Sequence, residues 1–311
     1  MNELKVLSYD LRKHVVDMII AGKGGHIGGD MSVMEILVEL YMKQMNISPE
    51  NKDLDNRDRF VLSKGHSVES YYAVLAKKGF FPMEEVISTF SQFGSKFIGH
   101  PNNKLPGIEM NSGSLGHGLP VCVGMAMAGK MDRKDYRVYV VMGDGELAEG
   151  SVWEGAMAAS HYCLDNLCAV VDRNRLQISG CTEDVMGHDD LHERFRSFGW
   201  HVIDVADGND IDQLDAAFEE AKTVKGKPTV LIANTVKGCG SPVMENKAAW
   251  HHKVPTAQEY SEIIRDFEKE RRPCFMNKIP NRKAICDTLM EAARRIKILW
   301  CCAVIPGVPH P

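Results

Sequence analysis

The residues best suited to chemistry in this 311-residue chain are an aspartate and an asparagine that each follow an apolar run. Asp144 lies in a Gly-Asp-Gly turn after the run 138–142, and Asn174 comes shortly after the run 167–171. A carboxylate and an amide oxygen are hard ligands that suit Mg²⁺, whose octahedron is usually completed by phosphate oxygens and water. The pair therefore predicts a magnesium site for a ligand that carries a diphosphate.

The elements that must position this pair form a βαβ unit. Each apolar run has the length of a strand, and a helical stretch from about Ser151 lies between them. Two such strands lie parallel, so their carboxyl ends meet at one edge of the sheet, where open α/β sheets bind ligands. Gly145 lets backbone N–H groups approach a phosphate, and the helix that follows favours negative charge at its N-terminus.

Two commoner phosphate-binding motifs are excluded. The chain contains no G-x-x-x-x-G-K-[ST] segment, and its Gly-Asp-Gly turn lacks the third glycine of the G-x-G-x-x-G fingerprint. An ordinary tight turn with a solvated aspartate is the alternative for the turn alone. The asparagine thirty residues later (174 − 144 = 30), after a second strand, argues against that alternative.

Composition bounds the class of protein. The chain is 44% apolar and 25% charged, with a net charge of −5, which is ordinary for a soluble globular protein. Interspersed charges give no sign of a nucleic-acid or anionic-membrane surface. No apolar run reaches the roughly 18 residues of a membrane span, and no signal-peptide pattern opens the chain.

The nine cysteines have no C-x-x-C spacing and are odd in number, so they predict reduced thiols in a cytoplasmic protein. We expect Cys122, Cys163 and Cys168 to be buried, because their neighbours are apolar. Cys301 and Cys302 have no predicted role.

Periodicity predicts the remaining elements. The second helix is expected to begin at Ser32, which with Glu35 has the spacing of a capping box. The expected strands are 59–62, 138–142, 167–171, 200–205 and 228–235, and the expected helices are 3–21, 32–40, one after His66, 83–90, one after Gly118, one from about Ser151, 211–224, 256–272 and 281–297.

Several histidines lie in loops where a ligand could reach them. His26 is flanked by glycines, His66 follows a short strand near a helix N-terminus, and His100 precedes a proline that keeps it out of a helix. A further pair, His251 and His252, lies near the end of the predicted sheet domain. On spacing alone the alternatives are a turn histidine, a helix cap and a surface pair.

The segment from the Gly-Asp-Gly turn to Asn174 resembles the thiamine diphosphate motif, and the surrounding sequence resembles transketolase. Four further blocks look like transketolase blocks in transketolase order, and together the blocks cover roughly residues 5 to 260. These blocks are Gly25–Gly29, Asp58–His66, Gly99–Pro101 and Gly113–Gly118.

The resemblance implies an α/β fold, a parallel sheet with helices on both faces, that binds thiamine diphosphate and Mg²⁺, with Ca²⁺ or Mn²⁺ as substitutes. It also implies three sets of site residues. The metal ligands would be Asp144, Asn174 and the carbonyl of Leu176; the other cofactor contacts His66, Gly113, Ser114, Leu115, Gly145, Glu146, Asn174 and His252; and the catalytic, substrate-contacting residues His26, His100 and His252.

The sequence departs from the family pattern at a few positions. His252 is taken as the match to the family's H-G-A-P histidine, with His251 as an extra neighbour. His117 stands where glutamine is usual, and Arg173 and Arg175 flank the asparagine where other residues are usual.

The resemblance covers only the diphosphate-binding half of a transketolase. Residues 1–275 are predicted as that domain, and residues 276–311 as a helix and tail of unknown role. The glutamate that activates the cofactor belongs to a second domain in the family. The chain therefore resembles the N-terminal subunit of a split transketolase, needing a C-terminal subunit in a heterotetramer of two copies of each, with Glu149 between the two active sites.

Three functions remain open. The first is transfer of a two-carbon ketol unit from a ketose phosphate to an aldose phosphate, favoured by His26, His100 and His252. The second is a subunit of another thiamine diphosphate enzyme, similar to 1-deoxyxylulose-5-phosphate synthase or to the E1 component of a 2-oxo-acid dehydrogenase. The third is a non-catalytic cofactor-binding or scaffolding homologue, disfavoured by the intact Asp144, Asn174 and His66.

Overall fold

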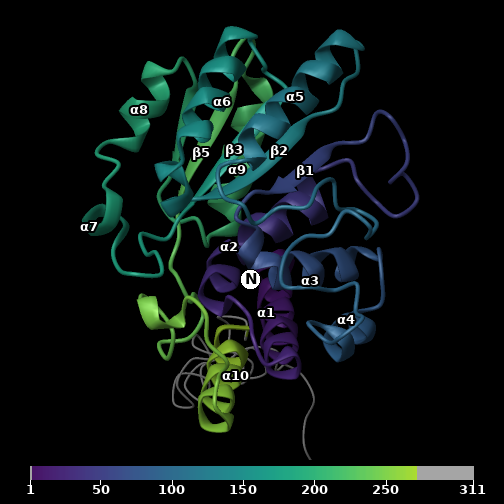
Figure 1. Ribbon diagram of the computed structural model, residues 1–311, viewed down its shortest axis with the longest axis vertical. Coiled ribbons are helices and arrows are strands. Elements are labelled where there is room, and N and C mark those ends of the chain that lie inside the picture. Colours follow the sequence, from purple (N-terminus) through teal and green to yellow (C-terminus); the bar gives the residue numbers. More distant parts are fainter. Residues whose placement is uncertain (1, 272–311) are drawn as a thin grey trace, which may run out of the picture. The chain divides into compact units, whose positions relative to one another are not determined.

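Five strands form one parallel sheet in the computed structural model, which describes residues 2–271 (Figure 1). Their order across the sheet is β1-β2-β3-β5-β4, and every neighbouring pair is parallel. The strands are β1 (Arg59–Leu62), β2 (Val138–Gly143), β3 (Leu167–Arg173), β4 (His201–Val205) and β5 (Thr229–Asn234). The predicted strands and their parallel pairing are confirmed.

Ten α-helices accompany the sheet in the described part of the chain. They are α1 (Glu3–Gly22), α2 (Ile27–Glu39), α3 (Val68–Lys78), α4 (Met83–Thr89), α5 (Gly118–Met131), α6 (Gly150–His161), α7 (Thr182–Met186), α8 (Leu191–Ser197), α9 (Ile211–Thr223) and α10 (Ala257–Arg271). The predicted helix at 281–297, the boundary at 275 and Cys301–Cys302 lie outside the described residues.

Both faces of the sheet are buried, because alternate residues of each strand pack into two different cores. Tyr139 and Val141 of β2 face the core that includes α1, α2, α3 and α9. Val138 and Val140 face the core that includes α5, α6 and α8. This two-sided burial explains the continuous apolar runs of the strands and confirms helices on both faces.

The start of the second helix was predicted wrongly. Helix α2 begins at Ile27, so Ser32 and Glu35 lie inside it and form no capping box. All thirteen residues of α2 are buried, and no side chain caps its N-terminus; Ser32 and Glu35 bond to other elements of the fold. Ser32 Oγ, for example, donates to Asp172 Oδ2 at 2.7 Å. The prediction for Cys163 is also wrong, because it is exposed in the turn after α6, whereas Cys122 and Cys168 are buried.

The two ends of the described chain pack against each other. Tyr9 of α1 and Phe267 of α10 have ring centroids 6.0 Å apart, and Tyr260 Oη donates to Asp17 Oδ1 at 2.9 Å. Helix α10 therefore covers part of the first helix of the chain.

A buried ion pair fastens α2 to α1. Arg12 Nη1 donates to Glu35 Oε1 and Arg12 Nη2 to Glu35 Oε2, both at 2.6 Å, and both side chains are fully buried. Asn209, in the loop before α9, donates to Glu35 Oε2 at 2.9 Å. Burial raises the pKa of Glu35, but the charge and hydrogen bonds of Arg12 outweigh it and lower this pKa to about 2.

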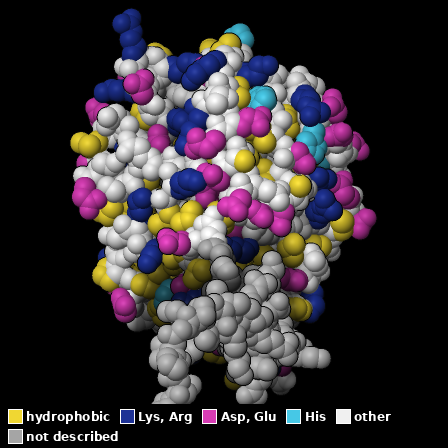
Figure 2. Space-filling view, turned by 180° about the vertical axis from the view of Figure 1, so that it is seen from behind, with side chains coloured by type: hydrophobic (Ala, Val, Ile, Leu, Met, Phe, Trp, Pro, Cys, Tyr) yellow, Lys and Arg dark blue, Asp and Glu magenta, His cyan; other side chains and the backbone are white. Residues whose placement is uncertain are grey.

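The surface carries mixed charge. Figure 2 shows Lys and Arg side chains interspersed with Asp and Glu on one face of the molecule. No helix within residues 2–271 has the length and apolar character needed to cross a membrane.

Breaking the Arg12–Glu35 pair is predicted to destabilise the protein strongly. Glu35→Leu leaves a buried guanidinium without its partner, which costs about 3–5 kcal/mol. Arg12→Met combined with Glu35→Leu should recover most of this loss, because no charge stays buried. Urea unfolding measures both, and Glu219→Leu, which removes an exposed partner of Lys222, is the matched control with an expected cost below about 1 kcal/mol.

The same pair predicts an acid limit. The folded-state pKa of Glu35 lies below its ordinary value of about 4.3, so its stabilising contribution is fully present above that pH and is lost as the pH falls towards 2. Glu35→Gln should lack this acid-dependent part. An identical pH profile of the free energy of unfolding in both proteins would contradict the assignment.

Candidate cofactor site

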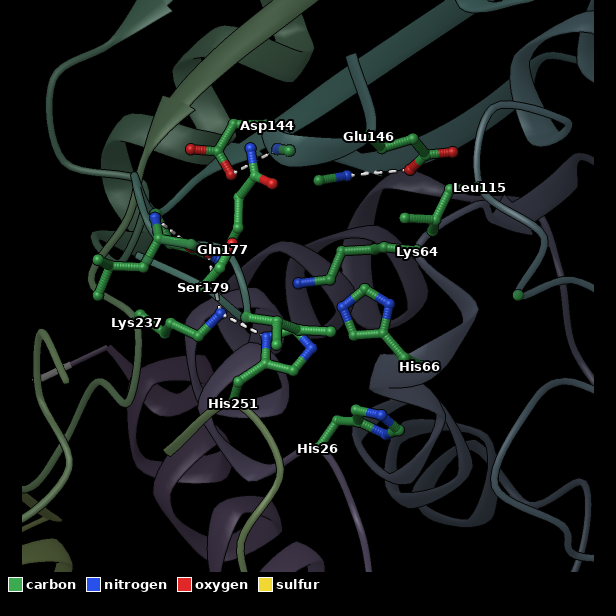
Figure 3. Close-up of a pocket in the computed structure, with 16 residues that line it drawn as sticks. His26, Lys64, His66, Leu115, Asp144, Glu146, Gln177, Ser179, Lys237 and His251 are labelled. Carbon is green, nitrogen blue, oxygen red and sulfur yellow. Dashed lines mark hydrogen bonds between the residues drawn. The ribbon is translucent and has the colours of Figure 1, made fainter. Parts of the chain in front are cut away.

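A cavity of about 440 Å³ lies at the carboxyl edge of the sheet (Figure 3). Its walls come from the segments that follow β1, β2, β3 and β5, together with the loop before α5, the start of α2 and the segment near residue 250. The lining residues are His26, Lys64, His66, Gly113, Leu115, Gly143, Asp144, Gly145, Glu146, Asn174, Leu176, Gln177, Ile178, Ser179, Lys237 and His251.

Asp144 lies at the end of β2 and is held by three donors. Its Oδ1 accepts from Gly145 N at 3.0 Å, and its Oδ2 accepts from Arg175 N at 2.7 Å and Thr182 Oγ1 at 3.2 Å. Burial, and then the negative charge of Asp172, raise the pKa of Asp144 to about 6. A nearby cation would offset both effects, so this carboxylate is suited to a metal.

Asn174 and Leu176 lie beside Asp144 because Gly143 of β2 pairs with Asp172 of β3. Asn174 is buried, its Nδ2 donates to Ser32 Oγ at 3.3 Å, and its Oδ1 accepts from Leu176 N at 3.2 Å. Arg175 between them has a φ of 64°, which turns the chain so that its own N–H reaches Asp144. Asp144, Asn174 and Leu176 thus line the same cavity.

Glu146 joins the turn after β2 to two other loops. Its Oε1 accepts from Gly116 N at 2.9 Å and from the hydroxyl of Ser63, and its Oε2 accepts from Gly143 N at 3.1 Å. Burial raises the pKa of Glu146, whereas these hydrogen bonds act against the shift. Glu146 therefore fixes the glycine loop before α5 against the end of β2.

Two buried lysines supply positive charge to the cavity. Lys64 pairs with Asp172 and donates to the carbonyl of Gly29 at 3.1 Å. Lys237 Nζ donates to the Leu176 carbonyl at 3.0 Å and is 2.9 Å from His251 Nδ1. Burial, and then the charge of Lys64, lower the pKa of Lys237 to about 8.

Four histidines surround His26. Its ring centroid is 5.3 Å from that of His66, 6.1 Å from His100, 5.6 Å from His251 and 4.8 Å from His252. Burial, followed by neighbouring histidine and lysine charges, lowers the pKa of His26 to about 4, and burial with the charge of Lys237 lowers that of His251 to about 3. These two imidazoles are therefore neutral near pH 7.

Most of the predicted site residues converge on this cavity. His26, His66, Gly113, Leu115, Asp144, Gly145, Glu146, Asn174 and Leu176 line it. Ser114, His100 and His252 are exposed and are not among its lining residues, although the rings of His100 and His252 lie beside His26. His251, which was predicted only as an extra neighbour, does line the cavity. The assignment of His252 as the cofactor and substrate contact stays a prediction.

Lys64 and Lys237 were missed as site residues. Each follows the end of a parallel strand at the ligand-binding edge and lies next to a glycine, and this pattern could have identified them. Figure 3 shows Lys64, His66, His26 and His251 converging on one space, with Asp144 and Glu146 across it.

The residues fit a divalent cation with a diphosphate. Within residues 2–271 there is no group of three or more His, Cys, Asp or Glu side chains that could hold a metal ion. Lys64 and Lys237, which line the same cavity, suit a phosphate. Two further buried atoms at the cavity, Gln177 Nε2 and His26 Nδ1, have no hydrogen-bond partner among the described residues and are free for a ligand.

Sequence and structure comparisons agree on the family. The family model described as the thiamine diphosphate-binding domain of transketolase matches residues 5–281. An apulose-4-phosphate transketolase subunit of Phocaeicola vulgatus is 48% identical over 263 residues, which cover 85% of this chain and 93% of that protein. The 6-deoxy-6-sulfo-D-fructose transketolase subunit SqwG of Clostridium sp. is 41% identical over 247 residues, covering 79% and 89%.

Longer transketolases match over part of their length. Human transketolase is 39% identical over 264 residues, which cover 85% of this chain and 42% of that protein. The solved structure of a transketolase from Leishmania mexicana superposes with a TM-score of 0.80 at 30% identity, covering 88% of this chain and 42% of that one. The chain therefore belongs to the transketolase family, a family of transferases, and is similar to those members in which the thiamine diphosphate-binding domain is a separate polypeptide.

Proposed function

We propose that this chain is the cofactor-binding subunit of a thiamine diphosphate- and Mg²⁺-dependent transketolase, which moves a two-carbon ketol unit from a ketose phosphate to an aldose phosphate. The observation that carries the proposal is the cavity itself, which Asp144, Asn174 and Leu176 line together with the buried Lys64 and Lys237. A cation would offset the negative charge of Asp144, and Lys64 and Lys237 would stabilise the negative charge of a diphosphate.

The ligands of the cation would be Asp144, Asn174 and the Leu176 carbonyl, with Ca²⁺ or Mn²⁺ able to substitute. The diphosphate would receive hydrogen bonds from His66 and from backbone N–H groups near Gly145. When bound, thiamine diphosphate supplies a nucleophilic carbon that can attack a ketose carbonyl. The chain's own part is to hold the cofactor, exclude water and orient the sugar.

Neutral histidines suit that orienting role. A neutral imidazole has one N–H donor and one acceptor nitrogen, so it can bond a sugar hydroxyl in either sense and can hold or release a proton. We assign His26, His100 and one of the pair His251 and His252 to the sugar. Neutral rings also avoid adding buried positive charge beside Lys237.

We further propose that activity needs a second polypeptide. The relatives in Phocaeicola vulgatus and Clostridium sp. are named as subunits, and the chain spans about two fifths of the longer transketolases. A C-terminal subunit with the pyrimidine-binding domain would complete two active sites in a heterotetramer, with Glu149 between them. The reaction would belong to cytoplasmic carbohydrate metabolism, of the pentose phosphate type or in a pathway for another sugar phosphate.

Removing the metal-binding carboxylate tests the site. Asp144→Ala should weaken Mg²⁺-dependent thiamine diphosphate binding by about 100-fold or more, because it removes the only full negative charge among the ligands. Calorimetry with the partner present measures this. Asp184→Ala, which changes an exposed aspartate on α7, is the matched control and should bind normally. Unchanged affinity in Asp144→Ala would refute the metal site.

Histidine variants test the sugar contacts. His26→Ala and His100→Ala should each lower ketol transfer by about a hundredfold or more while cofactor affinity changes little. Comparing His251→Ala with His252→Ala identifies the functional member of that pair, since only one should show the same loss. Near-normal kinetics in all four variants on every active donor would overturn the proposed pocket.

Dependence on a partner is tested by proton exchange at C2 of thiamine diphosphate, followed by NMR in deuterated buffer. The exchange should be slow on this chain alone, because the activating glutamate belongs to the partner, and fast after the partner is added. Dimerisation alone decides nothing, since the chain could self-associate. Fast exchange together with full turnover by the lone chain would refute a two-chain enzyme.

A further inference from the structure

Two acidic side chains lie in contact behind His26. Asp30 on α2 and Glu69 on α3 are both fully buried and lie next to each other, because Ser70, the neighbour of Glu69, donates its N–H and its hydroxyl to Asp30, each at 2.8 Å. An ionised carboxylate can accept hydrogen bonds but cannot donate one, so a hydrogen bond between two carboxyl groups requires a proton on one of them. Two negative charges buried side by side would also repel each other strongly.

The other hydrogen bonds of the pair leave one oxygen on each residue for the shared proton. Asp30 Oδ1 accepts from Ser70 N at 2.8 Å, and Glu69 Oε1 accepts from His26 N at 3.2 Å. The second oxygens, Asp30 Oδ2 and Glu69 Oε2, have no donor among the described residues. A proton between these two atoms satisfies both.

Glu69 and the first turn of α2 hold the backbone of His26 from two sides, and the carboxyl group of the pair that contacts it is that of Glu69. Glu69 binds the N–H of His26, while the carbonyl of His26 accepts from Asp30 N at 3.2 Å and from Gly29 N at 3.0 Å. Gly25 allows the close approach, because a Cβ there would lie 2.3 Å from Glu69 Oε1 and 2.5 Å from Ile19 Cγ1. The backbone of His26 is thereby fixed on both its N–H and its C=O.

The surroundings favour a single negative charge on the pair. Burial is the main effect that raises the pKa of each carboxyl, and the charge of Asp30 raises that of Glu69 further. The charged or titratable groups around the pair are Lys64 in the turn before α3, which stabilises an ionised Asp30, Tyr72 on α3, which feels the charge of Glu69, and His26 itself.

We propose that Asp30 and Glu69 share one proton as a carboxylic acid–carboxylate pair, and that this pair holds His26 in position at the cavity. Neither residue is among those that line the cavity, so both are positioning residues that act through His26. The catalytic consequence rests on the proposed function, because it assumes that His26 contacts the sugar.

Hydrogen exchange tests the hold on His26 without any activity assay. In the full chain, Glu69→Leu should speed exchange of the His26 backbone N–H by about tenfold, the equivalent of one lost hydrogen bond. Glu69→Gln should stay near the wild-type rate, because its amide oxygen still accepts from His26 and its NH₂ donates to Asp30. Glu84→Leu, at an exposed glutamate on α4, is the control. Equal exchange in wild type and Glu69→Leu would overturn the positioning role.

Infrared spectroscopy tests the shared proton. At neutral pH the wild type should show the carbonyl stretch of a protonated carboxylic acid, and this component should disappear in both Asp30→Asn and Glu69→Gln. Difference spectra against each variant separate it from bands of other buried acids such as Asp144. If this component is still present in both variants, the shared proton is wrong. This test does not depend on whether Glu69→Leu folds.

The pH dependence of stability has a defined sign. The folded pair keeps a proton that the unfolded chain releases near its ordinary carboxyl pKa of about 4, so the free energy of unfolding falls as the pH rises above that value. In Asp30→Asn, Glu69 is the one carboxyl group left in the pair, so the folded protein holds no shared proton. The stability of wild type relative to Asp30→Asn should therefore decrease from about pH 4 upward, and a constant difference would contradict the pair.

Kinetics of the complex with its partner separate the two proposals. Asp30→Leu and Glu69→Leu should lower kcat with little change in cofactor affinity, and Glu69→Gln should restore most of it. If His26→Ala itself has no effect, the proposed role of His26 fails, while exchange and infrared results still decide the pair. If His26→Ala is impaired but Asp30→Leu and Glu69→Leu are not, the positioning role is wrong.

Discussion

Parallel register is the constraint on which the site depends. Because all five strands run in the same direction, the residues that follow β1, β2, β3 and β5 meet at a single edge. The pairing of Gly143 with Asp172 brings Asp144 next to the turn that carries Asn174, although the two are thirty residues apart in sequence (174 − 144 = 30). Lys64 and Lys237 reach the same edge from β1 and β5. The sheet thus brings together acidic and basic side chains that no single segment could supply.

Burying charged groups at this edge costs desolvation energy, and their ion pairs and hydrogen bonds offset only part of it. Asp172 is compensated by Lys64 and by hydroxyl groups of Ser32 and Thr235. Asp144 and Lys237 are less well compensated, since burial raises the pKa of the first and lowers that of the second. Buried groups with perturbed pKa values in a cavity are typical of functional sites, where stability is given up for binding. Away from this edge, the buried charges of Arg12 and Glu35 compensate each other through two hydrogen bonds.

The sequence allowed the sheet and much of the site to be predicted, because local patterns determine them. Apolar runs followed by glycine turns identify β2 and β3, and pairing then places Asp144 and Asn174. The start of α2 was predicted wrongly, because Ser32 and Glu35 bond to distant elements that a local pattern does not reveal. The inward position of His251 depends on the short 3₁₀ turn Ala248–Trp250, which places one of two adjacent histidines at the cavity. Cys163 has apolar sequence neighbours but lies in a turn, so neighbours alone did not predict its exposure.

The contact between α1 and α10 bears on how the protein is made. The apolar side of α1 that meets Phe267 leaves the ribosome long before that residue is synthesised, since Tyr9 and Phe267 are 258 positions apart (267 − 9 = 258). Domains are synthesised from the N-terminus at about 5–20 residues per second, so this surface waits for tens of seconds at the slower rate. During that interval Tyr9 and Asp17 lack the partners that α10 later provides.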